Sequence, residues 1–301
     1  MDIKSAFVNS DLDKEIYMQQ PEGFNDGTGR VLKLHQALYG LKQAGRPWHQ
    51  RLHGILLNFG YVQSSADECI FIKITRSNIK VISVYVDDLG LFTNKKEGMA
   101  HIKGELNQKF PMTDLGEMKK ILGIRVERDR KHGTLKISQG PYIDIILAQL
   151  QMQDVNPIST PLNKTVNLTV PTESKDGPTI NLPYAKAIRS IMYAALRTRS
   201  DIAFAIQQLS QFTTSYGLEH WTVVKHVLRY LKGTRYGGII FRQEAGLNLE
   251  IFTDADYVNQ ANALSIGSGT IVWSSKKQRT VALSTMEAEY IALTEGTKQL
   301  V

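Results

Sequence analysis

Apolar and polar positions follow two different periods along the first 110 residues. Cys69–Ile74 and Ile79–Val86 are rich in β-branched and aromatic residues, and Arg76-Ser77-Asn78 between them is typical of a turn. Trp48–Tyr61 and Lys96–Phe110 carry apolar residues three or four positions apart, which predicts amphipathic helices. The first part of the chain is therefore expected to mix helices with strands.

The same two periods continue beyond Phe110. Pro141 lies in the first turn of an expected helix, and Ser200-Asp201 is expected to cap another. The later strands are expected at Lys119–Arg128, Thr134–Ser138, Gly237–Phe241 and Leu247–Thr253, and the later helices at Pro141–Leu150, Ile202–Phe212 and Glu219–Leu231. For the basic residues of the last helix (Lys225, Arg229 and Lys232), a solvated face is the alternative to a binding surface.

Val155–Pro183 interrupts this pattern. Five of the nine prolines fall within it, and Thr172–Gly177 between them is polar and rich in turn-forming residues. Because proline disfavours both helix interiors and central strands, the sequence predicts an exposed linker here.

The composition limits the number of domains, the kinds of partner and the cellular compartment. The 301 residues are 42% hydrophobic, which is enough for one large or two ordinary domains, and the net charge of +7 suits a partner with a phosphate backbone. We find no run of about 18 apolar residues and no signal peptide pattern. The single cysteine, Cys69, fits a reducing compartment and is expected to fill core space, and the seven histidines show no metal-ligand spacing.

Tyr85-Val86-Asp87-Asp88 lies between two apolar β-like runs, Ile79–Val84 and Leu89–Thr93. Two adjacent carboxylates at a tight turn repel each other, and a divalent cation removes that penalty. Mg²⁺ prefers such hard oxygen ligands. An ordinary solvated hairpin turn is the alternative interpretation.

A third carboxylate, Asp2, opens the chain, and several ordered segments accompany it. Together they resemble the reverse transcriptase and ribonuclease H region of a copia-type LTR retrotransposon Pol polyprotein, and this chain is expected to be a fragment of one. The segments that carry the resemblance are Met1–Phe24, Leu38–Leu52, Tyr85–Asp88, Asp114–Asp129, Ser159–Leu162, Ser190–Ala205, His220–Thr234, Ile251–Tyr257 and Trp273–Leu293.

The resemblance implies an α+β fold in four parts. Residues 1–154 would form a reverse transcriptase palm, an antiparallel sheet with helices, whose fingers are truncated at the N-terminus. Residues 155–183 would be the linker, and 184–243 a helical thumb and connection. Residues 244–301 would form an incomplete ribonuclease H-like α/β unit.

The resemblance also assigns site residues. Asp2, Asp87 and Asp88 would hold two Mg²⁺ or Mn²⁺ ions for nucleotidyl transfer. Phe7 would reject a ribose 2′-hydroxyl, with a core aromatic as the alternative. Gln43, Gly45, Arg46 and Tyr85 would contact nucleotide and template, and Leu122-Gly123 would support the primer end from a strand.

For ribonuclease H the resemblance implies Asp254 and Glu289 as metal ligands, with Asp256 and Glu287 accessory. The chain ends before the third and fourth acidic ligands of the family. The stretch between Tyr257 and Trp273 is also short by about one strand. We therefore expect no ribonuclease H activity, and impaired polymerase activity in this fragment.

The implied partners are an RNA template, a DNA primer, RNA/DNA hybrid and deoxynucleoside triphosphates, with no membrane. The implied location is inside the cell, in a cytoplasmic particle or the nucleus. Three alternatives stay open. The chain could be a relic that binds nucleic acid without chemistry, a poorly folding genomic relic, or a chain whose ends are missing from the gene model.

Overall fold

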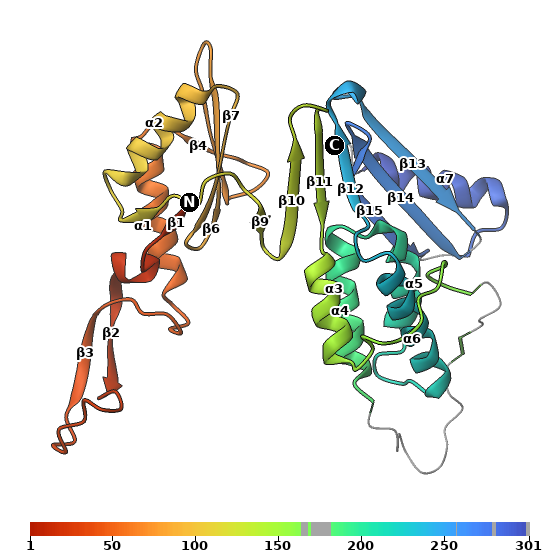
Figure 1. Cartoon of the computed structure of the whole chain (residues 1–301), viewed down its shortest axis with the longest axis horizontal. Helices are drawn as coiled ribbons and strands as arrows, with labels where there is room; N and C mark the ends of the chain where they lie inside the picture. The colour runs from red at the N-terminus through yellow and green to blue at the C-terminus, as the bar shows by residue number, and fades with distance from the viewer. Residues whose placement is uncertain (164–167, 170–181, 257, 279–280, 299–301) are drawn as a thin grey trace. The chain divides into compact units, whose positions relative to one another are not determined.

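A computed structural model describes residues 1–163, 168–169, 182–256, 258–278 and 281–298 (Figure 1). The chain divides into two compact units, Met1–Met118 and Lys119–Val301. The boundary between the two units follows Met118, whereas the palm is predicted to end at residue 154.

Unit 1 is built on a six-stranded antiparallel sheet in the order β4-β5-β6-β7-β1-β8. Two helices supply apolar side chains to its core, among them Trp48, Leu52 and Leu56 from α1 and Ile102 and Leu106 from α2. The elements are β1 (Asp2–Ile3), η1 (Ala6–Asn9), α1 (Gly45–Asn58), β4 (Val62–Gln63), β5 (Ile70–Ile74), β6 (Ile79–Tyr85), β7 (Asp88–Thr93), α2 (Lys96–Asn107) and β8 (Met112–Thr113).

The expected strands and helices of this unit are confirmed to within a few residues, but the role of Cys69 is not. Cys69 is exposed, just ahead of β5, and its backbone N–H donates to Asp67 Oδ1. The partial desolvation of its thiol, and then the neighbouring Asp67, raise the pKa of Cys69. The prediction of a core residue was wrong: Cys69 precedes β5, and its side chain is exposed.

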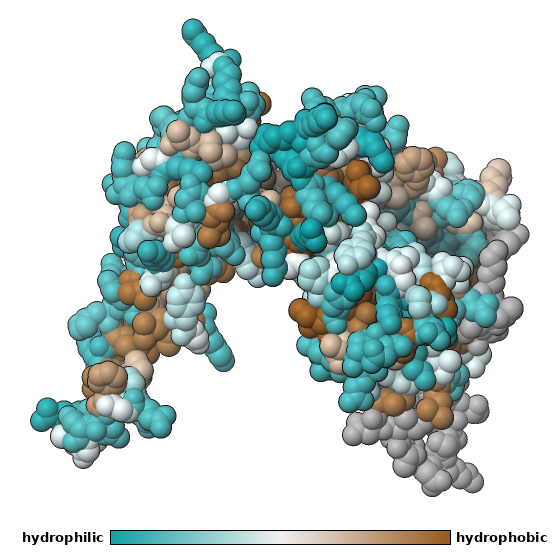
Figure 2. Space-filling model, viewed as in Figure 1, coloured by the Kyte–Doolittle hydropathy of each residue, from teal (hydrophilic) through white to brown (hydrophobic). Residues whose placement is uncertain are grey.

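A two-stranded arm, β2 (Asp11–Gln19) with β3 (Val31–Gln36), extends from the same unit. Tyr17, Phe24 and Val31 are all more than half exposed, and Figure 2 shows hydrophobic residues along this arm. A hairpin of two strands gains little stability alone in water, because it buries one small apolar face.

Unit 2 has a helical core. Buried side chains such as Ile143, Ile191, Leu209 and Leu228 bring its helices together. The helices are α3 (Gly140–Gln149), α4 (Tyr184–Arg197), η2 (Ser200–Ile202), α5 (Ala203–Ser210) and α6 (Leu218–Gly233). Neither Ser200 nor Asp201 makes the expected capping bond, because the chain forms a 3-10 turn there.

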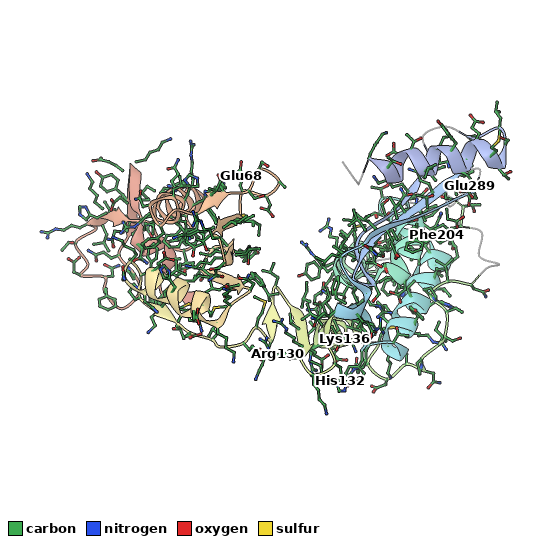
Figure 3. All side chains as sticks on the ribbon, turned by 90° about the horizontal axis from the view of Figure 1, so that it is seen from above. Glu68, Arg130, His132, Lys136, Phe204 and Glu289 are labelled. Atoms are coloured by element: carbon green, nitrogen blue, oxygen red, sulfur yellow. The ribbon has the colours of Figure 1, made fainter. Side chains whose placement is uncertain are left out.

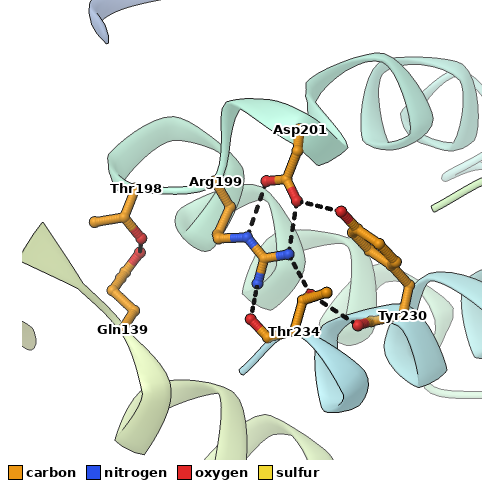
Figure 4. Close-up of polar contacts among 6 residues, drawn as sticks. All are labelled: Gln139, Thr198, Arg199, Asp201, Tyr230 and Thr234. Carbon is orange, nitrogen blue, oxygen red and sulfur yellow. Dashed lines mark hydrogen bonds and ion pairs between the residues drawn. The ribbon is translucent and has the colours of Figure 1, made fainter. Parts of the chain in front are cut away.

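Asp201 instead pairs with a buried arginine, Arg199, which is 2% exposed (Figure 4). Arg199 donates to both carboxylate oxygens of Asp201, at 2.9 and 2.7 Å, and to the carbonyl and hydroxyl oxygens of Thr234. Tyr230 donates to Asp201 Oδ2 at 2.7 Å. Because a buried guanidinium needs partners, this network ties η2 to α6.

A four-stranded sheet in the order β12-β11-β10-β9 belongs to the same unit, with all pairs antiparallel. The strands are β9 (Lys120–Ile121), β10 (Ile124–Asp129), β11 (Thr134–Ser138) and β12 (Gly238–Arg242), and η3 (Gln243–Ala245) follows. The expected single strand at Lys119–Arg128 was wrong: it is a hairpin, and Leu122 and Gly123 form its turn.

A second sheet, β13-β14-β15, follows, and α7 packs on it. Its elements are β13 (Leu249–Ala255), β14 (Asn259–Ile266), β15 (Gly269–Lys277) and α7 (Thr285–Thr297). The stretch between Tyr257 and Trp273, which was expected to lack about one strand, contains β14. Every residue of β13 pairs with β14.

Most of the expected linker (164–167 and 170–181) lies outside the described residues. Its beginning is held against α6. Arg229 and Lys232 donate to the carbonyls of Asn156 and Val155 at 2.7 and 2.8 Å, and His226 Nε2 lies 3.0 Å from the carbonyl of Thr160. Two of the three basic residues of α6 therefore bind the backbone of the chain itself.

Candidate active site

The acidic motif occupies a two-residue hairpin turn between β6 and β7. Tyr85 and Asp88 are the last paired residues, and Val86 and Asp87 form the loop. Val86 has φ of 57°, while Asp87 is not in the positive-φ region. This combination is typical of a type II′ turn, whose first position favours glycine. A β-branched residue there stores about 1–3 kcal/mol of strain, and such strain concentrates at functional sites.

Asp2 lies directly opposite Asp88 on the neighbouring strand β1. The flanking bonds run from Ile3 N–H to the Asp87 carbonyl, at 2.9 Å, and from Leu89 N–H to the Met1 carbonyl, at 2.8 Å. Asp2 and Asp88 are therefore a non-hydrogen-bonded pair, the class with the closer side chains. The sheet register thus brings three predicted site residues to one end of the β1–β7 pair.

The electrostatics reflect this crowding. Partial burial, followed by the negative charges of Asp87 and Asp2, raises the pKa of Asp88. Like charges held this close disfavour joint ionisation, and a divalent cation relieves the repulsion. The donor set of carboxylate oxygens fits Mg²⁺ or Mn²⁺. Among the described residues, however, the side chains do not form a group of three that already converges on one point.

Two aromatic side chains missed by the sequence reasoning contact this turn. Trp48 Nε1 donates to the Val86 carbonyl at 2.7 Å, and Tyr39 donates to Asp87 Oδ2 at 3.1 Å. Burial and the bond to Asp87 raise the pKa of Tyr39. Both residues lie in Leu38–Leu52, but no local pattern signals a contact with a turn about 40 residues away in the chain.

The expected nucleotide and template residues lie in the same unit. Phe7 is half-buried in η1 and packs edge-on against Tyr39, with ring centroids 4.6 Å apart. Gly45 and Arg46 are exposed in the first turn of α1, and Gln43 precedes them. The side chain of Tyr85, beside the acidic turn, is exposed.

The Leu122-Gly123 prediction needs a correction, since both residues form a turn and neither lies in a strand. Leu122 has φ of 49° and Gly123 has φ of 75°, as in a type I′ hairpin turn. The hydroxyl of Tyr193 on α4 donates to the Leu122 carbonyl at 2.5 Å. Gly123 is needed here for its positive φ.

The structure does not bring Asp254 and Glu289 together. Ile251 and Thr253 of β13 face α7, since a Cβ on Gly296 would meet both side chains. Because successive strand residues point to opposite faces, Asp254 lies on the face turned away from α7. Glu289 is on α7 itself (Figure 3), and its neighbour Glu287 accepts the Leu283 N–H in the helix cap. Asp256 accepts N–H groups of its own turn.

A sequence profile described as "Reverse transcriptase (RNA-dependent DNA polymerase)" matches residues 1–164. The chain belongs to the reverse transcriptase family. The match contains Asp2, Asp87, Asp88, Tyr39 and Trp48.

Curated relatives of this reverse transcriptase-family chain are retrotransposon proteins. The Pol polyprotein from transposon TNT 1-94 of Nicotiana tabacum is 38% identical over the whole chain, which covers 24% of that relative. The Pol polyprotein from transposon RE1 of Arabidopsis thaliana is 35% identical, with 21% of its length covered. The putative transposon Ty5-1 protein of Saccharomyces cerevisiae is 28% identical, and each chain covers the other completely. These matches confirm the resemblance to copia-type Pol polyproteins.

The chain thus spans about a quarter or less of the two Pol polyproteins. Within its described part, no helix of this reverse transcriptase-family chain is long and apolar enough to cross a membrane.

Proposed function

We propose that this chain is the RNA-directed DNA polymerase part of a copia-type retrotransposon polyprotein. The observation that carries the proposal is the placement of Asp2 opposite Asp88, with Asp87 in the adjoining turn. A hairpin turn without a catalytic function would not require a third carboxylate on the neighbouring strand. The family membership makes polymerisation the chemistry of first choice.

In this proposal Asp2 and Asp87 would hold two Mg²⁺ or Mn²⁺ ions, and Asp88 would support them. The bound ions would supply the charge that lowers the pKa of the attacking 3′-hydroxyl and stabilises the leaving pyrophosphate. The protein positions these groups and supplies electrostatic stabilisation, without a covalent step of its own. The raised pKa of Asp88 fits a carboxyl that gains from a nearby cation.

The same proposal assigns the substrate contacts. Phe7, packed on Tyr39, would lie under the sugar of a deoxynucleoside triphosphate. Gln43, Gly45 and Arg46 would meet template and nucleotide, because the exposed start of α1 leaves backbone N–H groups and a guanidinium accessible. Tyr85 would contact the same substrates. The Leu122-Gly123 turn would support the DNA primer.

We assign the sheet of unit 1 to the palm, helices α4–α6 to the thumb and connection, and β13–β15 with α7 to the ribonuclease H-like part. We propose no hydrolysis of RNA/DNA hybrid, because Asp254 lies on the sheet face opposite α7. The proposed location is inside the cell, in a cytoplasmic particle or the nucleus.

Primer extension on poly(rA)/oligo(dT) with Mg²⁺ or Mn²⁺ tests the proposal. The chain is compared with its Asp87→Asn, Asp88→Asn double variant, which keeps the shape of the turn. We expect impaired but measurable extension, which the double variant loses. A folded chain that fails to extend primers, but binds them with a salt-dependent affinity equal to that of the double variant, would instead be a nucleic-acid-binding relic.

A further inference from the structure

The Val86–Asp87 peptide is the central peptide of the acidic turn, and its orientation determines the turn type. Type I′ and type II′ turns share a positive φ at the first loop position and differ in the sign of φ at the second. The two forms interconvert by a flip of the central peptide. Aspartate tolerates the positive φ that the flipped form needs, so the sequence Val86-Asp87 does not itself exclude that form.

Trp48 fixes that peptide from outside the hairpin. Its Nε1–H donates to the Val86 carbonyl at 2.7 Å, and the indole is 2% exposed. Phe110 packs edge-on against the indole, with centroids 5.3 Å apart, which restricts its rotamer. A peptide unit is planar, so a fixed Val86 carbonyl also fixes the direction of the Asp87 N–H and of the chain leaving it.

We propose that Trp48 is a positioning residue that holds the acidic turn in its type II′ form and so orients the Asp87 carboxylate for metal binding. The part about metal binding rests on the proposed function; the part about the turn does not. Tyr39 acts on the same carboxylate, since its hydroxyl donates to Asp87 Oδ2 at 3.1 Å and leaves Oδ1 for a cation.

The test replaces Trp48 by 3-benzothienylalanine, which keeps the ring shape and removes the N–H donor, and by phenylalanine as a second variant. Trp273→Phe is the matched control, because Trp273 Nε1 donates to the Ala195 carbonyl at the same 2.7 Å but in unit 2. The first measurement is metal-free: the residual dipolar coupling of the Asp87 N–H in chain labelled with ¹⁵N-aspartate. The second is Mn²⁺ binding, followed by electron paramagnetic resonance.

We expect a changed Asp87 coupling in both Trp48 variants and an unchanged one in Trp273→Phe. We also expect Mn²⁺ affinity to fall about tenfold in the Trp48 variants, the usual effect of removing an outer partner of a metal ligand. An unchanged coupling in the folded benzothienylalanine chain would overturn the inference. A changed coupling in a chain that never binds Mn²⁺ at Asp87 would preserve the control of the turn and contradict the proposed polymerase site.

Discussion

Two regions of this chain carry acidic motifs of the same family resemblance, and the sheet register brings the residues of only one of them to the same end of a strand pair. Asp2 on β1 and Asp88 on β7 lie directly opposite each other, and Trp48 and Tyr39 bind the Val86–Asp87 loop that joins β6 to β7. In the β13–β15 region, Asp254 lies on the sheet face that α7 does not cover. Residues that match a family motif in sequence therefore come together only where strand register and supporting contacts place them.

The buried polar groups of the two regions also differ in whether they have hydrogen-bond partners. Beneath α7, the buried atoms Gln260 Oε1, Ser274 Oγ and Gln278 Oε1 have no hydrogen-bond partner. Among the described residues, the buried side-chain atoms without a partner all belong to unit 2. An unpaired buried polar group costs about 1–3 kcal/mol, so the sheet under α7 is stabilised less than its buried area suggests.

The largest expected effect comes from removing the negative charge of one aspartate in each region. We expect Asp2→Asn to lower primer extension by a factor on the order of 10² or more, because it removes one of the charges that would hold the proposed cations. Asp254→Asn should leave extension unchanged. Steady-state extension rates at saturating Mg²⁺ measure both, and an equal loss in the two variants would remove the contrast between the regions.

An effect of intermediate size is expected at the buried Arg199 of unit 2, whose charge is paired with Asp201. Asp201→Ala should lower the free energy of unfolding by about 2 kcal/mol, below the usual cost of breaking a buried pair because the Asp201 side chain is 40% exposed. Asp144→Ala breaks the more exposed pair with Arg235 and should cost less than about 1 kcal/mol. Urea unfolding measures both, and equal costs would contradict a special role for the Arg199 network.

The same pair predicts a pH dependence. Burial raises the pKa of Asp201, but hydrogen bonds and charge from Arg199 outweigh it, so the net pKa is lowered in the folded chain. Because the pKa of Asp201 is lower in the folded chain, the ionised carboxylate stabilises the fold at pH values above the unfolded-state pKa of about 3.9. This stabilisation is lost as the pH falls through the folded-state pKa. Unfolding free energies of Asp201→Asn should therefore fall less steeply with acid below about pH 4 than those of the unchanged chain.

The smallest effect compares two serines near α7. Ser274→Ala removes an unpaired buried hydroxyl and should stabilise the chain by about 1 kcal/mol. Ser284→Ala removes the hydroxyl that accepts the Glu287 N–H at the start of α7 and should destabilise it by about 1 kcal/mol. Thermal unfolding measures the opposite signs. Loss of stability in both variants would mean that Ser274 is paired.

Much of the local structure follows from the sequence. The β5–β6 hairpin, α2 and the position of the acidic turn are confirmed, because period and turn residues agree there. The hairpin at Leu122-Gly123 was missed because apolar residues continue through it, and leucine seldom adopts φ of 49°. The contact of Trp48 with Val86 and the face of Asp254 depend on tertiary packing, which no local pattern encodes.

The pairing of β11 with β12 affects the order in which the chain folds. Thr134–Ser138 pairs with Gly238–Arg242, so roughly 100 residues separate partners that are adjacent in the sheet. At about 5–20 residues per second on the ribosome, β11 emerges several seconds before β12. During that time one edge of β11 has open N–H and C=O groups that another nascent chain can pair with. The polar residues Thr134, Lys136 and Ser138 on this strand disfavour such aggregation until β12 arrives.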